Sequence, residues 1–181
     1  MGYSVIDNFL SPEEFKKLKD YFYYSRELPW YYSPYTVLPE AKEADEPDHP
    51  QLQHVLLSPK TGEPVWYHSG STMVLDLINK INPNTLYRIK LNMQFPNKIQ
   101  ERNALHLDLP NFSEHTIGIY YLNTCDGYTF LKDGTKIDTI ENRLVLLSGD
   151  TMHTGCAPTT GRRVVINIDF INDYTSDLYK K

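Results

Sequence analysis

The feature that most constrains the fold is a change of hydrophobic period near residue 85. Before this point, apolar residues recur at helical spacing, and after it apolar and polar residues alternate. Over 85–95 the apolar side chains occupy every second position: Tyr87, Ile89, Leu91, Met93 and Phe95. Because successive side chains of a strand point to opposite faces, this pattern predicts a half-buried β-strand that ends at Pro96.

More strands are predicted downstream at short intervals. They are expected at 104–109, 115–123, 128–132, 135–139, 143–147 and 162–170. Asp133-Gly134 lies between two of them and is a hairpin signal, because glycine accepts the positive φ of a tight turn. Helices that precede a series of strands, rather than alternating with them, indicate an α+β, mainly β fold with an antiparallel two-sheet core and helices packed on one side.

The N-terminal part supplies the helices. A strand at 3–9 leads into SPEEFKKLKDYF (11–22), where Ser11 and Glu14 predict a capping box and Pro12 suits the first helical position. A second helix is predicted from 69 to the Asn82-Pro83 stop. Residues 26–70 are expected to be irregular, and the acidic stretch 41–51 is expected to be a mobile loop.

Length and composition restrict the function classes. A chain of 181 residues suits a single domain, 1–181, with its own hydrophobic core. The net charge of −5 argues against a nucleic-acid partner, and the apolar runs are too short for a membrane span. Cys125 and Cys156 are too few for a disulfide scaffold and are interpreted as small buried hydrophobes. No signal-peptide pattern opens the chain, so a cytoplasmic location is expected; the sequence does not predict the oligomeric state.

The stretch 104–109 carries a titratable base and a carboxylate on one predicted strand face. Its three leucines share the other face, which is expected to be core. His106 and Asp108 are two residues apart, so both side chains can reach one point, and His153 follows a strand and a turn that can return it there. Two histidines and one carboxylate form the facial triad of non-haem Fe(II) sites, although zinc sites use similar ligands.

The stretch GRRVVINIDF (161–170) predicts a strand with one apolar and one mixed face. Arg163 heads the mixed face, which also carries Asn167. A buried arginine is costly without an anion, and a dicarboxylate could supply one to its guanidinium fork. Arg163 is preferred over Arg162 as that anion-binding residue because its spacing and strand face fit better. Asn167 fits either a ligand contact or an internal hydrogen bond.

Five segments together, HLD, TIGIYYLN, GYTFL, NRLVLLSGDTMHTG and RRVVINIDF, resemble the catalytic core of 2-oxoglutarate- and Fe(II)-dependent dioxygenases. The similarity covers about 85–170 and is greatest to the prolyl 4-hydroxylase-like branch, including short bacterial and phage forms. It implies a double-stranded β-helix (a jelly-roll, cupin-like core). It also implies Fe(II) ligation by His106, Asp108 and His153, and binding of the cosubstrate's 5-carboxylate by Arg163 and Tyr121.

The same resemblance implies the cofactors and the reaction. The cofactors are Fe(II), 2-oxoglutarate and O2, with ascorbate as an additional reductant, and the compartment is the host cytoplasm if the chain is phage-encoded. Asp108 favours hydroxylation, because related halogenases lack this carboxylate. The implied substrate is a peptidyl proline, but Phe95 stands where several prolyl hydroxylases have tyrosine, and residues 126–130 depart from the family's Gly-Gly-Glu-Thr-x-Phe pattern.

The sequence is also compatible with two other hypotheses about the substrate and the function. One keeps the chemistry but places a free amino acid or another small metabolite in the site, so the partner is either a peptide or a small molecule. The other is a non-catalytic jelly-roll protein that binds metal as a sensor or binding module. Arg163 and Asp108 argue against this reading, because a structural metal site needs neither an open face nor a dicarboxylate anchor.

The remaining histidines and the aromatic segment receive other interpretations. His115 is expected at a sheet edge, His49 and His54 in a solvated loop, and His68 is left unassigned. Residues 30–35 contain the four rings Trp30, Tyr31, Tyr32 and Tyr35. These rings fit equally well as the wall of a substrate groove or as a cover for the β core.

Overall fold

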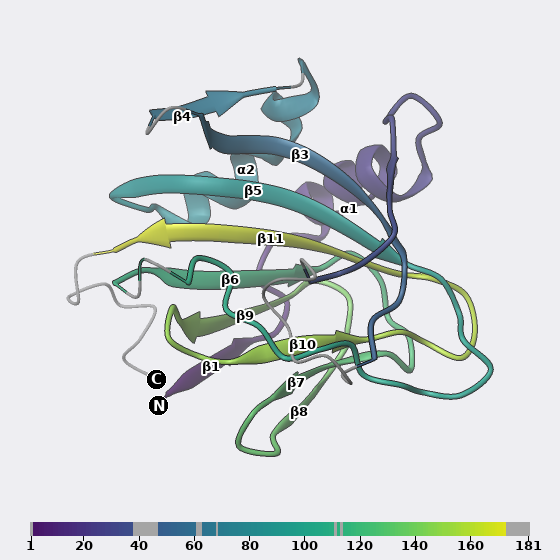
Figure 1. Ribbon diagram of the computed structural model, residues 1–181. Helices are drawn as coiled ribbons and strands as arrows, with labels where there is room; N and C mark the ends of the chain where they lie inside the picture. The colour runs from purple at the N-terminus through teal and green to yellow at the C-terminus, as the bar shows by residue number, and fades with distance from the viewer. Residues whose placement is uncertain are drawn as a thin grey trace.

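The computed structural model describes residues 2–37, 47–60, 63–67, 69–110, 112 and 114–172. An eight-stranded antiparallel sheet has the order β1-β9-β6-β11-β5-β3-β2, with β4 paired to β3. A second, three-stranded sheet has the order β10-β7-β8 (Figure 1). The strands are β1 (Tyr3–Ile6), β2 (Tyr31–Ser33), β3 (Gln51–Lys60), β4 (Glu63–Trp66), β5 (Thr85–Gln94), β6 (Thr116–Tyr121), β7 (Tyr128–Leu131), β8 (Lys136–Asp138), β9 (Arg143–Ser148), β10 (His153–Cys156) and β11 (Arg163–Ile171). This mainly β, two-sheet architecture confirms the predicted fold class.

Two helices cover one face of the large sheet, as Figure 1 shows, and both follow the sequence signals. Helix α1 (Pro12–Lys19) opens with the predicted capping box and continues as a π-helical turn, Asp20–Tyr24. A 3-10 turn (Ser69–Val74) precedes α2 (Leu75–Ile81), which ends at Asn82 in the left-handed conformation, φ 52°. No helix in the described part of the chain is long and apolar enough to cross a membrane.

The large sheet separates two apolar clusters. One lies between the sheet and the helices and includes Leu18, Leu77 and Ile166; the other, which includes Ile119 and Val145, lies between the two sheets. Alternation along β5 and β11 assigns most of their apolar side chains to the helix side and turns most of their polar ones toward the second sheet. Val165 is an exception, because it belongs to the cluster between the two sheets. The polar face is therefore an interior wall, shared by both strands in antiparallel register.

The interpretation of 26–70 as irregular is wrong. The ten-residue strand β3 pairs with β5, and β2 and β4 pair with β3. The pairing of β3 shifts register between Val55 and Leu57, so two neighbouring leucines, Leu56 and Leu57, are both buried. This irregularity removes the alternation on which the sequence argument depended. In the predicted loop 41–51, residues 41–46 lie outside the described residues, and Asp48 accepts hydrogen bonds from the backbone N–H groups of Thr36 and Val37.

The predicted strand at 104–109 is also absent from the structure. Within this segment one isolated bridge forms to β10, between His106 and His153, and a second, between Arg102 and Cys156, lies just before it. Its leucines are half-buried and do not form a core face. The strand that does form here is β10, which the sequence does not predict because HTGC has no alternation of apolar and polar residues.

Candidate active site

The backbone brings His106 and His153 face to face. Each donates its backbone N–H to the carbonyl of the other, with N–O distances of 3.0 and 3.1 Å, and their ring centroids are 4.9 Å apart. One histidine comes from the segment before β6 and the other is the first residue of β10. The bridge between them thus joins two parts of the chain that are 47 residues apart in sequence (153 minus 106).

Both imidazoles are oriented by backbone carbonyls. Nδ1 of His106 lies 3.3 Å from the Ala104 carbonyl oxygen, and Nδ1 of His153 lies 3.0 Å from that of Thr151. When Nδ1 carries the proton and donates it to the carbonyl, Nε2 keeps a free lone pair. This is the usual arrangement for a histidine that binds a metal.

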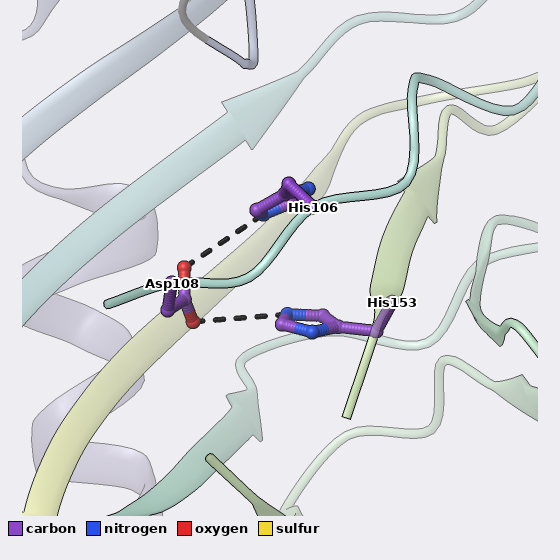
Figure 2. Close-up of side chains that lie close together, drawn as sticks. All are labelled: His106, Asp108 and His153. Atoms are coloured by element: carbon purple, nitrogen blue, oxygen red, sulfur yellow. Dashed lines mark ion pairs between the residues drawn. The ribbon is translucent and has the colours of Figure 1, made fainter. Parts of the chain in front are cut away.

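Asp108 completes a three-residue donor set with these rings (Figure 2). Its Oδ1 lies 3.7 Å from Nε2 of His106, and its Oδ2 lies 3.7 Å from Nε2 of His153. One ligand atom from each residue lies within 4.8 Å of the others. Oδ2 is buried and has no hydrogen-bond partner among the described residues. A buried carboxylate oxygen is rarely left unpaired, so this atom fits a metal ligand.

The charge states of this cluster suit a divalent metal. Burial and the neighbouring His153 lower the pKa of His106 to about 4, so its ring is neutral at pH 7. Burial alone would raise the pKa of Asp108, but Arg88 and the two imidazoles outweigh it and hold that pKa below its usual range. Two imidazoles and one carboxylate with converging ligand atoms are the donor set of a facial Fe(II) site.

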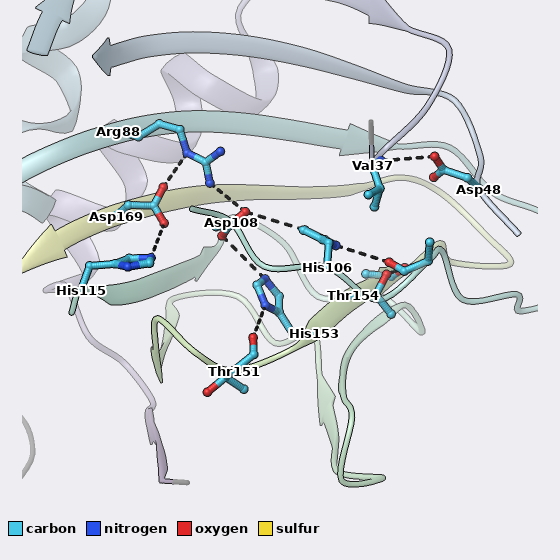
Figure 3. Close-up of polar contacts among 12 residues, drawn as sticks. Val37, Asp48, Arg88, His106, Asp108, His115, Thr151, His153, Thr154 and Asp169 are labelled. Carbon is cyan, nitrogen blue, oxygen red and sulfur yellow. Dashed lines mark hydrogen bonds and ion pairs between the residues drawn. The ribbon is translucent and has the colours of Figure 1, made fainter. Parts of the chain in front are cut away.

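A chain of buried charges supports Asp108 from behind (Figure 3). Nη2 of Arg88, on β5, lies 2.7 Å from Oδ1 of Asp108, and its Nε donates to Oδ2 of Asp169, on β11, at 2.5 Å. Asp169 Oδ1 lies 3.6 Å from Nε2 of His115, whose Nδ1 is 2.6 Å from the Phe112 carbonyl oxygen. Arg88 thus fixes the metal-facing carboxylate to two strands of the large sheet.

Arg88 and Asp169 were not identified as site residues from the sequence. The signal that could have found them is the strand register, since Arg88 on β5 pairs directly with Asp169 on β11. His115, expected at a sheet edge, is buried at the end of this chain of charges. Burial raises the pKa of Asp169 to about 7, with Arg88 opposing the shift.

Arg163 lies between the two sheets and has no carboxylate partner among the residues the structure describes. Its guanidinium donates to Thr139 Oγ1 at 2.9 Å, Thr129 Oγ1 at 2.9 Å and Gln94 Oε1 at 3.2 Å. Tyr121 lies beside it, with the guanidinium carbon 5.4 Å from the ring centroid and its hydroxyl 2.8 Å from Thr129 Oγ1. A buried cation held only by neutral groups is a ready partner for an anion.

Arg162 points the other way. Its guanidinium lies over the ring of Tyr23, 4.1 Å from the centroid, and donates to the backbone carbonyl of the same residue, on the helix side of the sheet. The structure therefore turns Arg163, and not Arg162, toward the metal-ligand cluster. This difference follows from the alternation of side chains along the last strand.

A cavity of about 860 Å³ connects the histidine cluster with Arg163. Tyr32 and Tyr35 line it, and Tyr32 is 68% exposed at its edge. Trp30 instead packs against the helix-side core, and Tyr31 stacks on His54 at 6.2 Å between ring centroids. The aromatic segment thus divides between the two roles that its sequence left open.

The other histidines and the cysteines are placed as follows. The interpretation of His54 as solvated is wrong, because it lies on β3, is 2% exposed and has Nδ1 2.6 Å from the Pro29 carbonyl oxygen. His49 is half-buried, with Nε2 3.2 Å from a carboxylate oxygen of Glu101. His68 lies outside the described residues. Cys156 is buried as expected, whereas Cys125 is half-buried.

Gly127 is expected to be intolerant of a side chain because it packs against Arg163. A Cβ at this position would lie 2.8 Å from the Cys156 carbonyl oxygen and 2.9 Å from Cδ of Arg163. Gly127→Ala should therefore displace one of these groups and lower the free energy of unfolding by about 1–3 kcal/mol, measured by chemical denaturation. Gly2→Ala, where a Cβ meets nothing within 4 Å, is the matched control. Equal stability of the two variants would show that the groups around position 127 can move to accommodate a side chain.

Comparison with known proteins places this geometry in a known fold. No protein-family model and no curated protein matches the sequence. Among solved structures, the chain is similar to an oxidoreductase of the 2OG-Fe(II) oxygenase family from Burkholderia pseudomallei, with TM-score 0.68, 11% identity, and coverage of 94% of this chain and 85% of that one. A prolyl hydroxylase from Trichoplax adhaerens, in complex with a peptide fragment of hypoxia inducible factor, gives TM-score 0.63, 15% identity, and coverage of 94% and 83%.

A third similar structure is that of an epimerase and not of a hydroxylase. It is the non-heme alpha-ketoglutarate-dependent epimerase SnoN from nogalamycin biosynthesis, with TM-score 0.62, 10% identity, and coverage of 94% of this chain and 76% of that one. At these identities the similarity establishes the fold. The chain thus has the double-stranded β-helix fold of the 2-oxoglutarate-dependent oxygenases, as its sequence motifs predicted.

Proposed function

We propose that this protein is an Fe(II)- and 2-oxoglutarate-dependent dioxygenase that hydroxylates its substrate. The observation that carries the proposal is that the cluster of His106, Asp108 and His153 lines the same cavity as the buried Arg163. A metal site alone would fit a sensor or a zinc enzyme. The additional buried arginine, which has no acidic partner in the described part of the chain, favours a dicarboxylate cosubstrate.

Each residue has a defined role in this proposal. The two Nε2 atoms and the carboxylate of Asp108 hold the metal on one side, and Arg88 keeps that carboxylate ionised and fixed in position. Arg163 and Tyr121 bind the remote carboxylate of 2-oxoglutarate. When bound, Fe(II) and 2-oxoglutarate supply the activation of O2 for oxidation of a C–H bond.

The substrate binds in the remaining part of the cavity, which the exposed ring of Tyr32 also lines. Two kinds of substrate are compatible with this fold, since one similar structure binds a peptide fragment and another belongs to the biosynthesis of a small molecule. The hydroxylase reaction can be tested before the substrate is known, because it depends on assembly of the metal and the cosubstrate.

Anaerobic protein with Fe(II) and 2-oxoglutarate is expected to show a weak visible charge-transfer band, because cosubstrate chelation to Fe(II) produces one. His106→Ala should abolish the band, since it removes one of three protein ligands. His49→Ala, a change to a half-buried histidine elsewhere, should leave it intact. Absorption spectroscopy under argon makes this measurement, and a wild-type protein without the band would rule out the proposed cosubstrate.

A further inference from the structure

The cavity carries more positive charge than the proposed cosubstrate and metal site account for. Arg88, Lys90 and Arg163 line it, and Asp108 is the one acidic side chain among its described lining residues. Arg88 is held between Asp108 and Asp169, and Arg163 is assigned to the cosubstrate. A divalent metal and a dianionic cosubstrate cancel each other's charge, so Lys90 remains without a directly paired carboxylate among the described residues.

Lys90 is fixed in the middle of the interior wall. It lies on β5 between Arg88 and Asn92, with Asn167 of β11 opposite on one side and Val55 of β3 opposite on the other. Because β5 is a central strand with β11 and β3 as neighbours, its cavity-facing side chains cannot reach solvent at an edge of the sheet. The half-buried ammonium group forms no hydrogen bond or ion pair with any residue in the described ranges.

The Lys90 side chain nevertheless stays largely charged at neutral pH. Burial, followed by the proximity of Arg88, lowers the pKa of Lys90 to about 8, and the nearby carboxylates of Asp108 and Asp169 oppose this shift without contacting the ammonium group. An ammonium group retained in a half-buried position without a direct ion pair to a described residue is costly, unless a bound molecule supplies the opposite charge.

Two neighbouring amides also lack partners. Oδ1 of Asn92, two residues along the same strand, and Oδ1 of Asn167, opposite Lys90 on β11, are both buried and accept no hydrogen bond from the described residues. Both side chains line the cavity. Buried polar atoms are rarely left unsatisfied in a folded protein, so this pair points to a polar ligand beside Lys90.

We infer that Lys90 forms a second anion-binding point beside the acceptor oxygens of Asn92 and Asn167, and that the substrate is a small polar molecule. Its acidic group pairs with Lys90, and its hydrogen-bond donors, such as an ammonium or hydroxyl group, bind the two amide oxygens. The inference rests on the proposed function, because it assigns the space beside His106, Asp108 and His153 to the molecule that is oxidised. A prolyl residue within a peptide carries no charge for Lys90 and supplies few hydrogen bonds for the two amides. A free amino acid or a hydroxy acid supplies both, because its carboxylate pairs with Lys90 and its ammonium or hydroxyl group donates to the amide oxygens.

The test uses anaerobic protein loaded with Fe(II) and 2-oxoglutarate and titrates it with matched probes. Free amino acids and N-acetyl amino acids are paired with their primary amides, phosphate monoesters are paired with their alcohols, and an N- and C-blocked prolyl peptide is included. Shifts of the charge-transfer band report binding, and thermal unfolding of the Zn(II)- and 2-oxoglutarate-loaded protein reports it independently. Acidic probes are expected to bind at least about tenfold more tightly than their neutral partners, with carboxylates and phosphates compared directly.

Variants of Lys90 separate this role from the role of the cosubstrate anchor. Lys90→Met should keep the band and lose the preference for acidic probes, and Lys90→Arg should retain it. Lys98→Met removes an exposed lysine just beyond β5 and should behave as the wild type.

Several results would overturn the inference. They are an unchanged acid preference in Lys90→Met, tighter binding of the blocked peptide than of every acid, or binding of no acidic probe at millimolar concentration. Loss of 2-oxoglutarate binding in Lys90→Met would instead make Lys90 part of the cosubstrate site. Absence of the band from the wild type is a separate failure, because it refutes the proposed function itself.

Discussion

Replacing Arg163 by methionine is expected to weaken 2-oxoglutarate binding about 100-fold, equivalent to about 2.7 kcal/mol, while metal binding stays within about threefold of the wild type. Arg163 is buried and its three hydrogen-bond acceptors are neutral. A carboxylate bound there gains a charge-assisted contact in a poorly solvated place, and methionine removes it. Titration of the charge-transfer band with 2-oxoglutarate gives the affinity, and titration with Zn(II) in the absence of cosubstrate gives the metal binding.

The control is Arg162→Met, because this arginine lies against Tyr23 on the opposite face of the sheet. It should leave the affinity for 2-oxoglutarate unchanged. Without cosubstrate, Arg163→Met should be no less stable than the wild type, since a buried cation without an acidic partner does not stabilise the folded state. If Arg162→Met weakened cosubstrate binding and Arg163→Met did not, the assignment of the anion-binding residue would be wrong.

The distinction between these arginines was available from the sequence because it depends only on the period of a strand. The run 161–170 alternates clearly, and the structure turns Arg163, Val165 and Asn167 to the cavity as that alternation requires. The same reasoning placed the polar residues of β5 on one face. Regular, central strands are therefore the part of this fold that local pattern predicts well.

The local environment of Asp108 was not predictable in the same way. The pattern of HLDLP indicated a strand, whereas the structure has a single bridge at His106 that is held by pairing with His153. Such pairing between distant segments leaves no periodic signal. The contact of Asp108 with Arg88 likewise joins an irregular segment to a strand, and only the three-dimensional arrangement reveals it.

Removal of Arg88 is expected to produce the largest loss of stability in this region. Arg88→Met leaves Asp108 and Asp169, both buried, without their shared cation. Removing one partner of a buried ionic cluster typically costs about 3–5 kcal/mol, because the remaining charges cannot be solvated. Chemical denaturation of the metal-free protein at pH 8 should show a deficit of this size. Arg102→Met, which removes an exposed arginine over the ring of Phe130, is the control and should cost less than about 1 kcal/mol.

The pH dependence of that deficit tests its electrostatic origin. Burial raises the pKa of Asp169 to about 7 in the wild type although Arg88 opposes the shift, so loss of Arg88 should raise that pKa further. A carboxyl group whose pKa is raised in the folded state binds its proton more tightly there than in the unfolded state. Its contribution to the free energy of unfolding therefore decreases as the pH rises up to and through the folded-state pKa. The deficit of Arg88→Met should therefore shrink as pH falls from 8 toward 5, and the double variant Arg88→Met/Asp169→Asn should recover part of it at pH 8. A deficit that is equal at all pH values and unchanged by Asp169→Asn would mean that Arg88 acts through packing of its side chain and not through its charge.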